Sequence, residues 1–231
     1  MKKKKLFNRL ATCLFLLTAY ALIYIPWFIS LEKNVTSGYH VIHMALDDYI
    51  PFCEYFVIPY YLWYLYMVVG LIIAAMTDRS DFLRSYLFTT LGMTVFLIIS
   101  TVYPNGHHLR PAVVDGNGFC ARLVRFLYST DTSTNLFPSL HVYNSIAAHI
   151  AIINNKKIKS KRHIRYASFI TCSLIIISTM VIKQHSLFDV ITAFITAGIF
   201  YPIAFNVDYR KLHSTILHKK AAWKNEHFKV S

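Results

Sequence analysis

The sequence predicts an all-α membrane protein that crosses the bilayer six times as a helix bundle, in one domain over residues 1–231. Its residues are 55% hydrophobic and only 15% charged, and the mean hydropathy is +0.42. A soluble domain carries about 25% charged residues. The apolar residues fall into blocks close to the ~20 that a helix needs to cross a bilayer. Since backbone groups in lipid must be hydrogen-bonded within the segment, these blocks are predicted to be helices.

The six predicted helices are joined by connections of unequal length, of which Ser30–Glu54 and Pro104–Leu136 on the outer side are the longest. The start, Met1–Lys5 and an apolar run, resembles a signal peptide, but the run continues to Ile29 and so indicates an uncleaved anchor. The connections expected on the inner side are short, and those on the outer side are longer and contain several turn residues. The predicted spans are Leu10–Ile29, Tyr55–Met76, Tyr86–Tyr103, Phe137–Ile153, Tyr166–Ile182 and Leu187–Phe205.

The net charge of +13 is distributed as a topology signal and does not indicate a nucleic-acid partner. With both termini in the cytoplasm, 19 Lys and Arg residues lie inside and 5 lie outside. This excess follows the positive-inside rule, so the sequence predicts a multi-pass protein of the cell membrane. The four cysteines lack the spacing of a metal site, and no acidic cluster lies near the motifs described next, so we expect no metal and no cofactor.

His185 and Asp189 lie four residues apart, beside the start of the last predicted helix. On a helix this spacing places both side chains on one face. The carboxylate can then hold one imidazole nitrogen and leave the other as a nucleophile. The alternative is a structural pair that ties two helix ends together.

Two further motifs contain residues suited to phosphate chemistry. Pro138-Ser139-Leu140-His141 indicates a helix start, where Pro138 suits the first turn and free amides with the Ser139 hydroxyl favour phosphate. His141 could then act as a general acid. The alternative is an N-capping serine beside an interfacial histidine. Arg110, stiffened by Pro111, can bind a phosphoryl group in a bidentate manner. The predicted topology puts all three motifs on the outer face.

In these motifs the chain resembles the type 2 phosphatidic acid phosphatases, a superfamily of integral membrane lipid phosphate phosphatases. Arg110-Pro111 matches the end of the first family motif, and Pro138-Ser139-Leu140-His141 matches the second. Ser178, His185 and Asp189 match the third at the family spacing. The six-span layout also matches, so the resemblance covers nearly the whole chain.

The chain departs from the family pattern at two cations. The family's lysine falls on Tyr103 and its third-motif arginine on Thr179. Lys183 could replace one of them, and His107 or its neighbour His108 could contribute near Arg110.

The resemblance implies a metal-independent hydrolase acting on a lipid phosphate or pyrophosphate at the outer leaflet. His185 would form a phosphohistidine, while His141 protonates the leaving group and Asp189 orients His185. Arg110, Ser139, Ser178 and Lys183 would bind the phosphate. The substrate would be a phospholipid or a polyprenyl phosphate, and the sequence leaves its identity and the oligomeric state open. The alternative is a transferase that passes a phospho-headgroup to an acceptor alcohol by the same histidine chemistry.

Two other classes of protein fit parts of the sequence. Histidines such as His141, His149 and His185 could be axial ligands of a haem. A catalytically inactive relative that binds lipid is the other possibility. His149 is expected to be a packed or hydrogen-bonded histidine of the fourth span, and the His and Asp residues of the first outer loop are expected to be solvated: His40, His43, Asp47 and Asp48.

Overall fold

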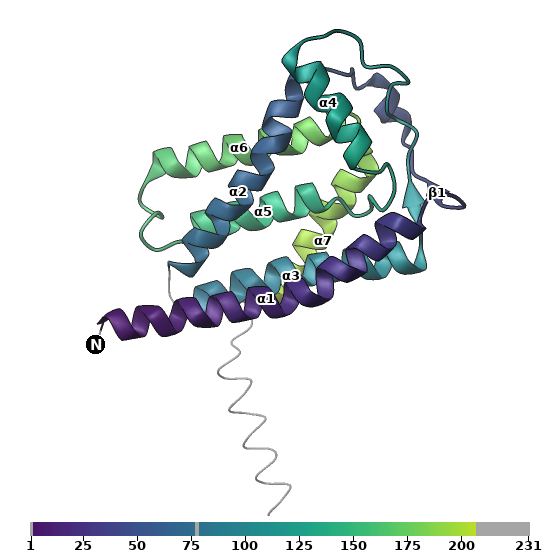
Figure 1. Cartoon of the computed structure of the whole chain (residues 1–231). Helices are drawn as coiled ribbons and strands as arrows, with labels where there is room; N and C mark the ends of the chain where they lie inside the picture. Colours follow the sequence, from purple (N-terminus) through teal and green to yellow (C-terminus); the bar gives the residue numbers. More distant parts are fainter. Residues whose placement is uncertain (1, 77–78, 207–231) are drawn as a thin grey trace, which may run out of the picture.

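The computed structural model describes residues 2–76 and 79–206, and within them the chain forms a bundle of seven α-helices (Figure 1). Two 3₁₀ turns, Ala45–Tyr49 and Glu54–Phe56, and a two-stranded parallel pair lie in the connections. The helices are α1 Lys2–Asn34, α2 Val57–Ala75, α3 Arg79–Val102, α4 Phe119–Thr130, α5 Leu140–Ile153, α6 Arg162–Val181 and α7 Leu187–Phe205, and the strands are β1 His40–Val41 and β2 Asn105–Gly106.

Five helices are long and apolar enough to cross a membrane, so the chain is a mostly helical, multi-pass membrane protein. This confirms the all-α class and the membrane character predicted from the sequence. The five segments are Leu10–Asn34, Glu54–Ala75, Ser80–Val102, Arg162–Val181 and Leu187–Phe205. The helix expected at Phe137–Ile153 is shorter: α5 begins only at Leu140 and has 14 residues.

α5 is the central helix of the bundle and packs against α2, α3, α6 and α7. Eight of its 14 residues are buried, which matches its position inside a ring of lipid-facing helices. Two glycines let the neighbouring helices approach it. A Cβ on Gly92 of α3 would lie 2.1 Å from the Tyr143 ring, and a Cβ on Gly70 of α2 would lie 2.8 Å from the Ala148 Cβ. Small residues at such crossings are typical of membrane helix packing.

The connection before α5 contains a helix that the sequence analysis treats only as loop. α4 is amphipathic, and its buried side is formed by Ala121, Val124 and Leu127, at spacings of three residues. The two long connections are also joined to each other, because β1 pairs with β2. The second connection is folded back on itself by an isolated bridge between Gly106 and Thr134.

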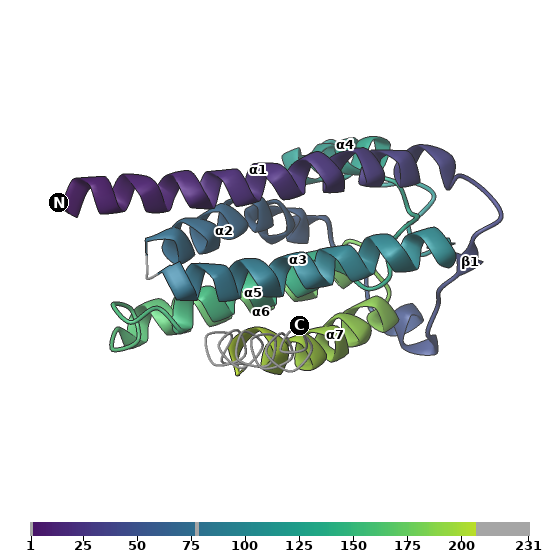
Figure 2. The same cartoon turned by 90° about the horizontal axis from the view of Figure 1, so that it is seen from below.

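The bundle has two ends of different composition. The start of α1, the end of α2, the start of α3 and the α5–α6 connection lie at one end, at the left of Figures 1 and 2. β1 and the chain leading into α5 and α7 lie at the other end. We call the latter the histidine end, because His141 is the second residue of α5 there and His185 lies two residues before α7.

Candidate functional site

The starts of α5 and α7 meet at the histidine end and bring two of the motifs together. The Ser139 amide donates a hydrogen bond to the Asp189 carbonyl, 3.2 Å away. His185 Nε2 lies 3.3 Å from His141 Nδ1, and the two ring centroids are 5.5 Å apart. Residues 44 positions apart in the chain therefore face each other with their ring nitrogens in contact.

Asp189 lies behind His185, on the side away from His141. His185 Nδ1 is 3.4 Å from Asp189 Oδ2, an oxygen that also accepts the Ser186 amide at 3.0 Å and so completes the capping box of α7. The histidine contact is long for a hydrogen bond, as is common before a ligand binds. With the proton on Nδ1 held by the carboxylate, Nε2 of His185 is a lone-pair nitrogen. Burial, with the nearby Arg110 charge, lowers the pKa of His185 to about 3, so the ring is neutral at pH 7.

Two aromatic side chains of α2 cover His141. The ring centroids of Tyr60 and Trp63 lie 4.6 and 4.5 Å from that of His141. Two polar atoms of this contact, His141 Nε2 and Trp63 Nε1, are buried without a hydrogen-bond partner among the described residues, and so is Asp189 Oδ1 behind His185. Buried polar atoms are normally paired, so the first two mark a place where a polar ligand would gain contacts. No sequence motif singles out Tyr60 or Trp63, so their position at His141 is visible only in the structure.

Arg110 is held beside the site by hydrogen bonds from its guanidinium group to loop carbonyls and to one side chain. Its Nη1 donates to the Asp131 carbonyl at 2.9 Å and its Nη2 to the Thr132 carbonyl at 2.7 Å. Nη2 also donates to Oε1 of Gln184, the residue before His185. The guanidinium packs over the Tyr128 ring, 4.6 Å from its centroid, and within the described chain its Nε is buried without a partner. Arg110 is thus fixed beside the histidines without touching them.

Asp131 is a second, half-buried charge in this network, and no sequence motif predicts it. Its Oδ2 accepts from Gln184 Nε2 at 3.2 Å and from the Tyr60 hydroxyl at 3.4 Å. Burial raises the pKa of Asp131 to about 6, although Arg110 acts in the opposite direction. The only signal for Gln184 is its position next to His185, and Asp131 lies 53 residues away from Gln184 in sequence.

Lys183 has a different partner from the one expected. Its ammonium group donates to the carbonyls of Asp47 and Ile50, at 2.7 and 2.5 Å. The Asp47 carboxylate in turn accepts from the Ser186 hydroxyl at 2.6 Å and the Leu187 amide at 2.7 Å. Asp47 is 1% exposed, so the prediction that it is a solvated loop residue is wrong. These contacts attach the first long connection to the start of α7.

The two serines expected to bind phosphate are occupied by their own helices. Ser139 is the N-cap of α5, and its hydroxyl accepts from the Val142 amide at 3.4 Å. Pro138 therefore precedes the cap and does not lie in the first turn. The Ser178 hydroxyl is fully buried and donates to the Ile175 carbonyl at 2.6 Å. We therefore leave Ser178 out of the site.

His107 supports the site as a neutral, hydrogen-bonded residue. Its Nδ1 accepts from the Leu109 amide at 3.2 Å, so the proton lies on Nε2, which donates to the Gln184 carbonyl at 2.9 Å. Burial lowers the pKa of His107 to about 4. His107 therefore supplies no positive charge at pH 7. His108 packs instead against Tyr39, with ring centroids 6.0 Å apart.

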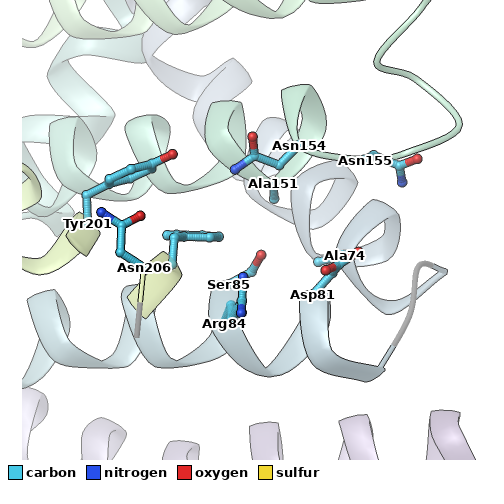
Figure 3. Close-up of a pocket in the computed structure, with 10 residues that line it drawn as sticks. Ala74, Asp81, Arg84, Ser85, Ala151, Asn154, Asn155, Tyr201 and Asn206 are labelled. Atoms are coloured by element: carbon cyan, nitrogen blue, oxygen red, sulfur yellow. The ribbon is translucent and has the colours of Figure 1, made fainter. Parts of the chain in front are cut away.

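Two cavities lie at the opposite end of the bundle. One of about 270 Å³ is formed by the ends of α2, α5 and α7 and the start of α3, and its lining includes Asp81, Arg84 and Asn154 (Figure 3). The other lies between α5 and α6 and is described below. Within residues 2–76 and 79–206, no three His, Cys, Asp or Glu side chains gather as a metal site would require.

The chain matches no known protein family, no curated protein and no solved structure.

Proposed function

We propose that this chain is a membrane phosphatase that hydrolyses the phosphate or pyrophosphate monoester of a lipid through a phosphohistidine on His185. The observation that carries the proposal is the contact of His185 Nε2 with His141 Nδ1, with Asp189 on the opposite nitrogen of His185. The Asp189 carboxylate orients His185, whose free nitrogen is the nucleophile. His141, next to that nitrogen, is the proton donor.

In the first step, Nε2 of His185 attacks phosphorus and the bond to the lipid oxygen breaks. The departing oxygen takes the Nδ1 proton of His141, which enters this step as the imidazolium that the bound anionic phosphate favours and leaves it as neutral imidazole. In the second step, water gives its proton to His141 and attacks phosphorus, and the N–P bond breaks to release phosphate. The two nitrogens touch in the present state, so the rings must separate to admit the phosphoryl group. The aromatic wall of Tyr60 and Trp63 is the surface along which His141 would move.

Arg110 acts in this mechanism mainly through its charge. Its Nη atoms are held by carbonyls and by Gln184, and its Nε has no partner among the described residues. A positive charge bonded to the residue next to His185 lowers the proton affinity of that histidine and favours the negative charge that gathers on the equatorial oxygens. The first amides of α5, beside the Ser139 cap, would complete the phosphate contacts.

The site lies at the extracytoplasmic surface in this proposal, with α5 as the sixth membrane-crossing helix. The Lys- and Arg-rich α5–α6 connection and the start of α1 lie together at the opposite end of the bundle from the histidines (Figures 1 and 2). The positive-inside rule assigns that end, and both termini, to the cytoplasm.

A lipid phospho-headgroup transferase is the second candidate, and the positions of the missing cations favour it. Tyr103 stacks on His40, with centroids 4.1 Å apart, and the buried Thr179 hydroxyl donates to the Ile176 carbonyl at 2.8 Å. Neither residue can supply the positive charge that the family pattern places at these positions, so the chain departs from the phosphatase pattern there and transfer to an acceptor alcohol stands as the second reaction. A haem is not favoured, because the facing nitrogens of His141 and His185 are closer than two axial ligands on opposite sides of one iron.

Phosphate release from a panel of lipid phosphates, with EDTA present, tests the proposal. We expect activity that vanadate inhibits and that His185→Ala abolishes, with an acid-labile, base-stable phosphoenzyme on the wild type alone. Product that forms only with an added acceptor alcohol would select the transferase. Turnover retained in a folded His185→Ala variant would refute both, and activity that needs added Mg²⁺ would refute the metal-independent mechanism.

A further inference from the structure

A cleft of about 580 Å³ opens between the end of α5 and the start of α6, at the end of the bundle opposite the histidine pair. Its α5 side is formed by His149 and Ile153. On α6 the lining residues follow one helical face, at positions i, i+3, i+4 and i+7: Arg162, Arg165, Tyr166 and Phe169. We call this feature the α5–α6 cleft.

The polar part of the cleft carries uncompensated positive charge. Within the part of the chain that the structure describes, neither the Arg162 nor the Arg165 guanidinium forms a hydrogen bond or an ion pair. The connection that leads into them, residues 154–165, contains six Lys and Arg residues and no acidic residue. An anion entering the cleft would meet two free guanidinium groups, which bind phosphate in a bidentate manner.

The other part of the cleft is aromatic and open. Tyr166 and Phe169 are 66% and 59% exposed, and both belong to an apolar helix long enough to cross the membrane. Exposed aromatic residues next to arginines at a helix end are the arrangement found at the membrane–water interface. The cleft thus offers cations at the headgroup level and apolar rings toward the hydrocarbon.

His149 adds a fixed polar contact to this cleft. Its Nδ1 is 2.8 Å from the Ser168 Oγ, which is itself 2.7 Å from the Tyr66 hydroxyl of α2. The ring also packs edge-on against Phe169, with centroids 6.1 Å apart. Because Nδ1 is engaged, Nε2 is the ring nitrogen left for a ligand. A histidine held in this way by two neighbouring helices is preorganised for binding.

We propose that the α5–α6 cleft binds one anionic glycerophospholipid, with its phosphate at Arg162 and Arg165 and its acyl chains along Tyr166 and Phe169. Charge complementarity selects an anionic headgroup over a zwitterionic one, and the apolar rings select a lipid over a soluble phosphate. This site is separate from the histidine pair and does not depend on the function proposed for it.

The test compares lipid binding to two doubly substituted full-length proteins in neutral detergent. Arg162→Gln/Arg165→Gln removes the two cleft charges, and Lys157→Gln/Lys159→Gln removes two charges from the same connection outside the cleft lining. The probe is phosphatidylglycerol, a phosphodiester that a monoesterase does not consume, with phosphatidylcholine as reference. Binding is measured by native mass spectrometry and by the thermal shift of unfolding.

We expect phosphatidylglycerol to bind the wild type and the lysine variant alike, and the arginine variant about tenfold more weakly. Equal losses in both variants would show only a diffuse basic surface and would overturn the proposal. Competition by soluble glycerol phosphate at the lipid's own concentration would show a free-phosphate site and would overturn it too. If the Gln variant fails to fold, Arg162→Lys/Arg165→Lys tests the same site, because it keeps the two charges but loses the bidentate guanidinium groups. We then expect it to bind phosphatidylglycerol more weakly than the wild type.

Discussion

His141 and His149 lie about two turns apart on α5, and both pack against aromatic rings, yet their polar partners and their exposure to a cleft differ. His141 touches a second imidazole and is covered by two aromatic rings. His149 bonds a serine and borders an open cleft whose two arginines have no partner among the described residues. The two histidines are about 12 Å apart along the helix. The chemistry of a histidine is therefore set by its neighbours. The surroundings of His141 suit proton transfer, and those of His149 suit a bound ligand.

Replacing each histidine by asparagine tests most directly whether the two residues differ in function. We expect His141→Asn to reduce phosphate release by about 10²- to 10⁴-fold, since the leaving oxygen loses its proton donor. His149→Asn should leave turnover within about threefold, because it has no contact with the pair. Initial rates on one lipid phosphate, measured with both variants at equal purity, give the two ratios.

The substrate provides the control for this prediction. A phosphate monoester whose leaving group needs no proton, such as nitrophenyl phosphate, should restore much of the rate in His141→Asn but not in a His185 variant. An equal loss in His141→Asn and His149→Asn would show that both changes only damage the fold.

The pH dependence of stability is the second test, because His107 is buried and neutral at the histidine end. Burial lowers its pKa to about 4, below the ordinary 6.5. A base with a depressed pKa stabilises the fold above pH 6.5, and this contribution is lost as the pH falls toward 4. The free energy of unfolding that His107 loses between these two pH values amounts to about 3 kcal/mol. Protonated Nδ1 would face the Leu109 amide, which adds to the cost of charging the ring. We expect the unfolding temperature of His107→Gln to depend less steeply on pH across this range.

Asp131 supplies the control for this pH dependence, because its effect on folding stability changes with pH in the opposite direction. Its pKa is raised to about 6 by burial, so its contribution is present at low pH and is lost as the pH rises through 6. The unfolding temperature of Asp131→Asn should therefore fall more steeply than that of the wild type as the pH decreases, whereas that of His107→Gln should fall less steeply. Identical slopes in the wild type and both variants would contradict the assigned buried states.

Much of the histidine end follows from local sequence rules. The spacing of His185 and Asp189 predicts that their side chains meet, and Asp189 in the first turn of α7 does lie behind His185, although His185 precedes the N-cap Ser186 and the two share no helix face. The apolar blocks predict the long helices, because in lipid the backbone must satisfy its own hydrogen bonds. Both rules act within one segment, so no knowledge of the rest of the chain is needed.

The rest depends on contacts between distant segments, which one sequence does not encode locally. Asp47 caps α7 across 140 residues, and Asp131 meets Gln184 across 53. The sequence predicts Lys183 as a phosphate ligand, but its ammonium group is held by carbonyls of the first long connection. α4 escapes detection because its 12 residues are too short and too polar on one side to resemble a membrane span.

The smallest expected effects come from the two glycines that let α3 and α2 approach the two halves of α5. A Cβ on Gly92 would lie 2.1 Å from a carbon of the rigid Tyr143 ring, and a Cβ on Gly70 would lie 2.8 Å from the Ala148 Cβ. Overpacking of this kind costs about 1–3 kcal/mol, so both Gly→Ala variants should unfold at lower temperature, Gly92→Ala more so. The matched control is Gly198→Ala, because a Cβ added there would have no atom within 4 Å.

The same two variants should also separate the two ends of α5 by function. Because Tyr143 follows His141 by two residues, Gly92→Ala should lower phosphate release. Ala148 precedes His149, so Gly70→Ala should weaken phosphatidylglycerol binding and spare turnover. Phosphate release and lipid binding measured on both proteins give the comparison. A Gly198→Ala variant as unstable as Gly92→Ala would show that the loss stems from glycine itself and not from helix approach.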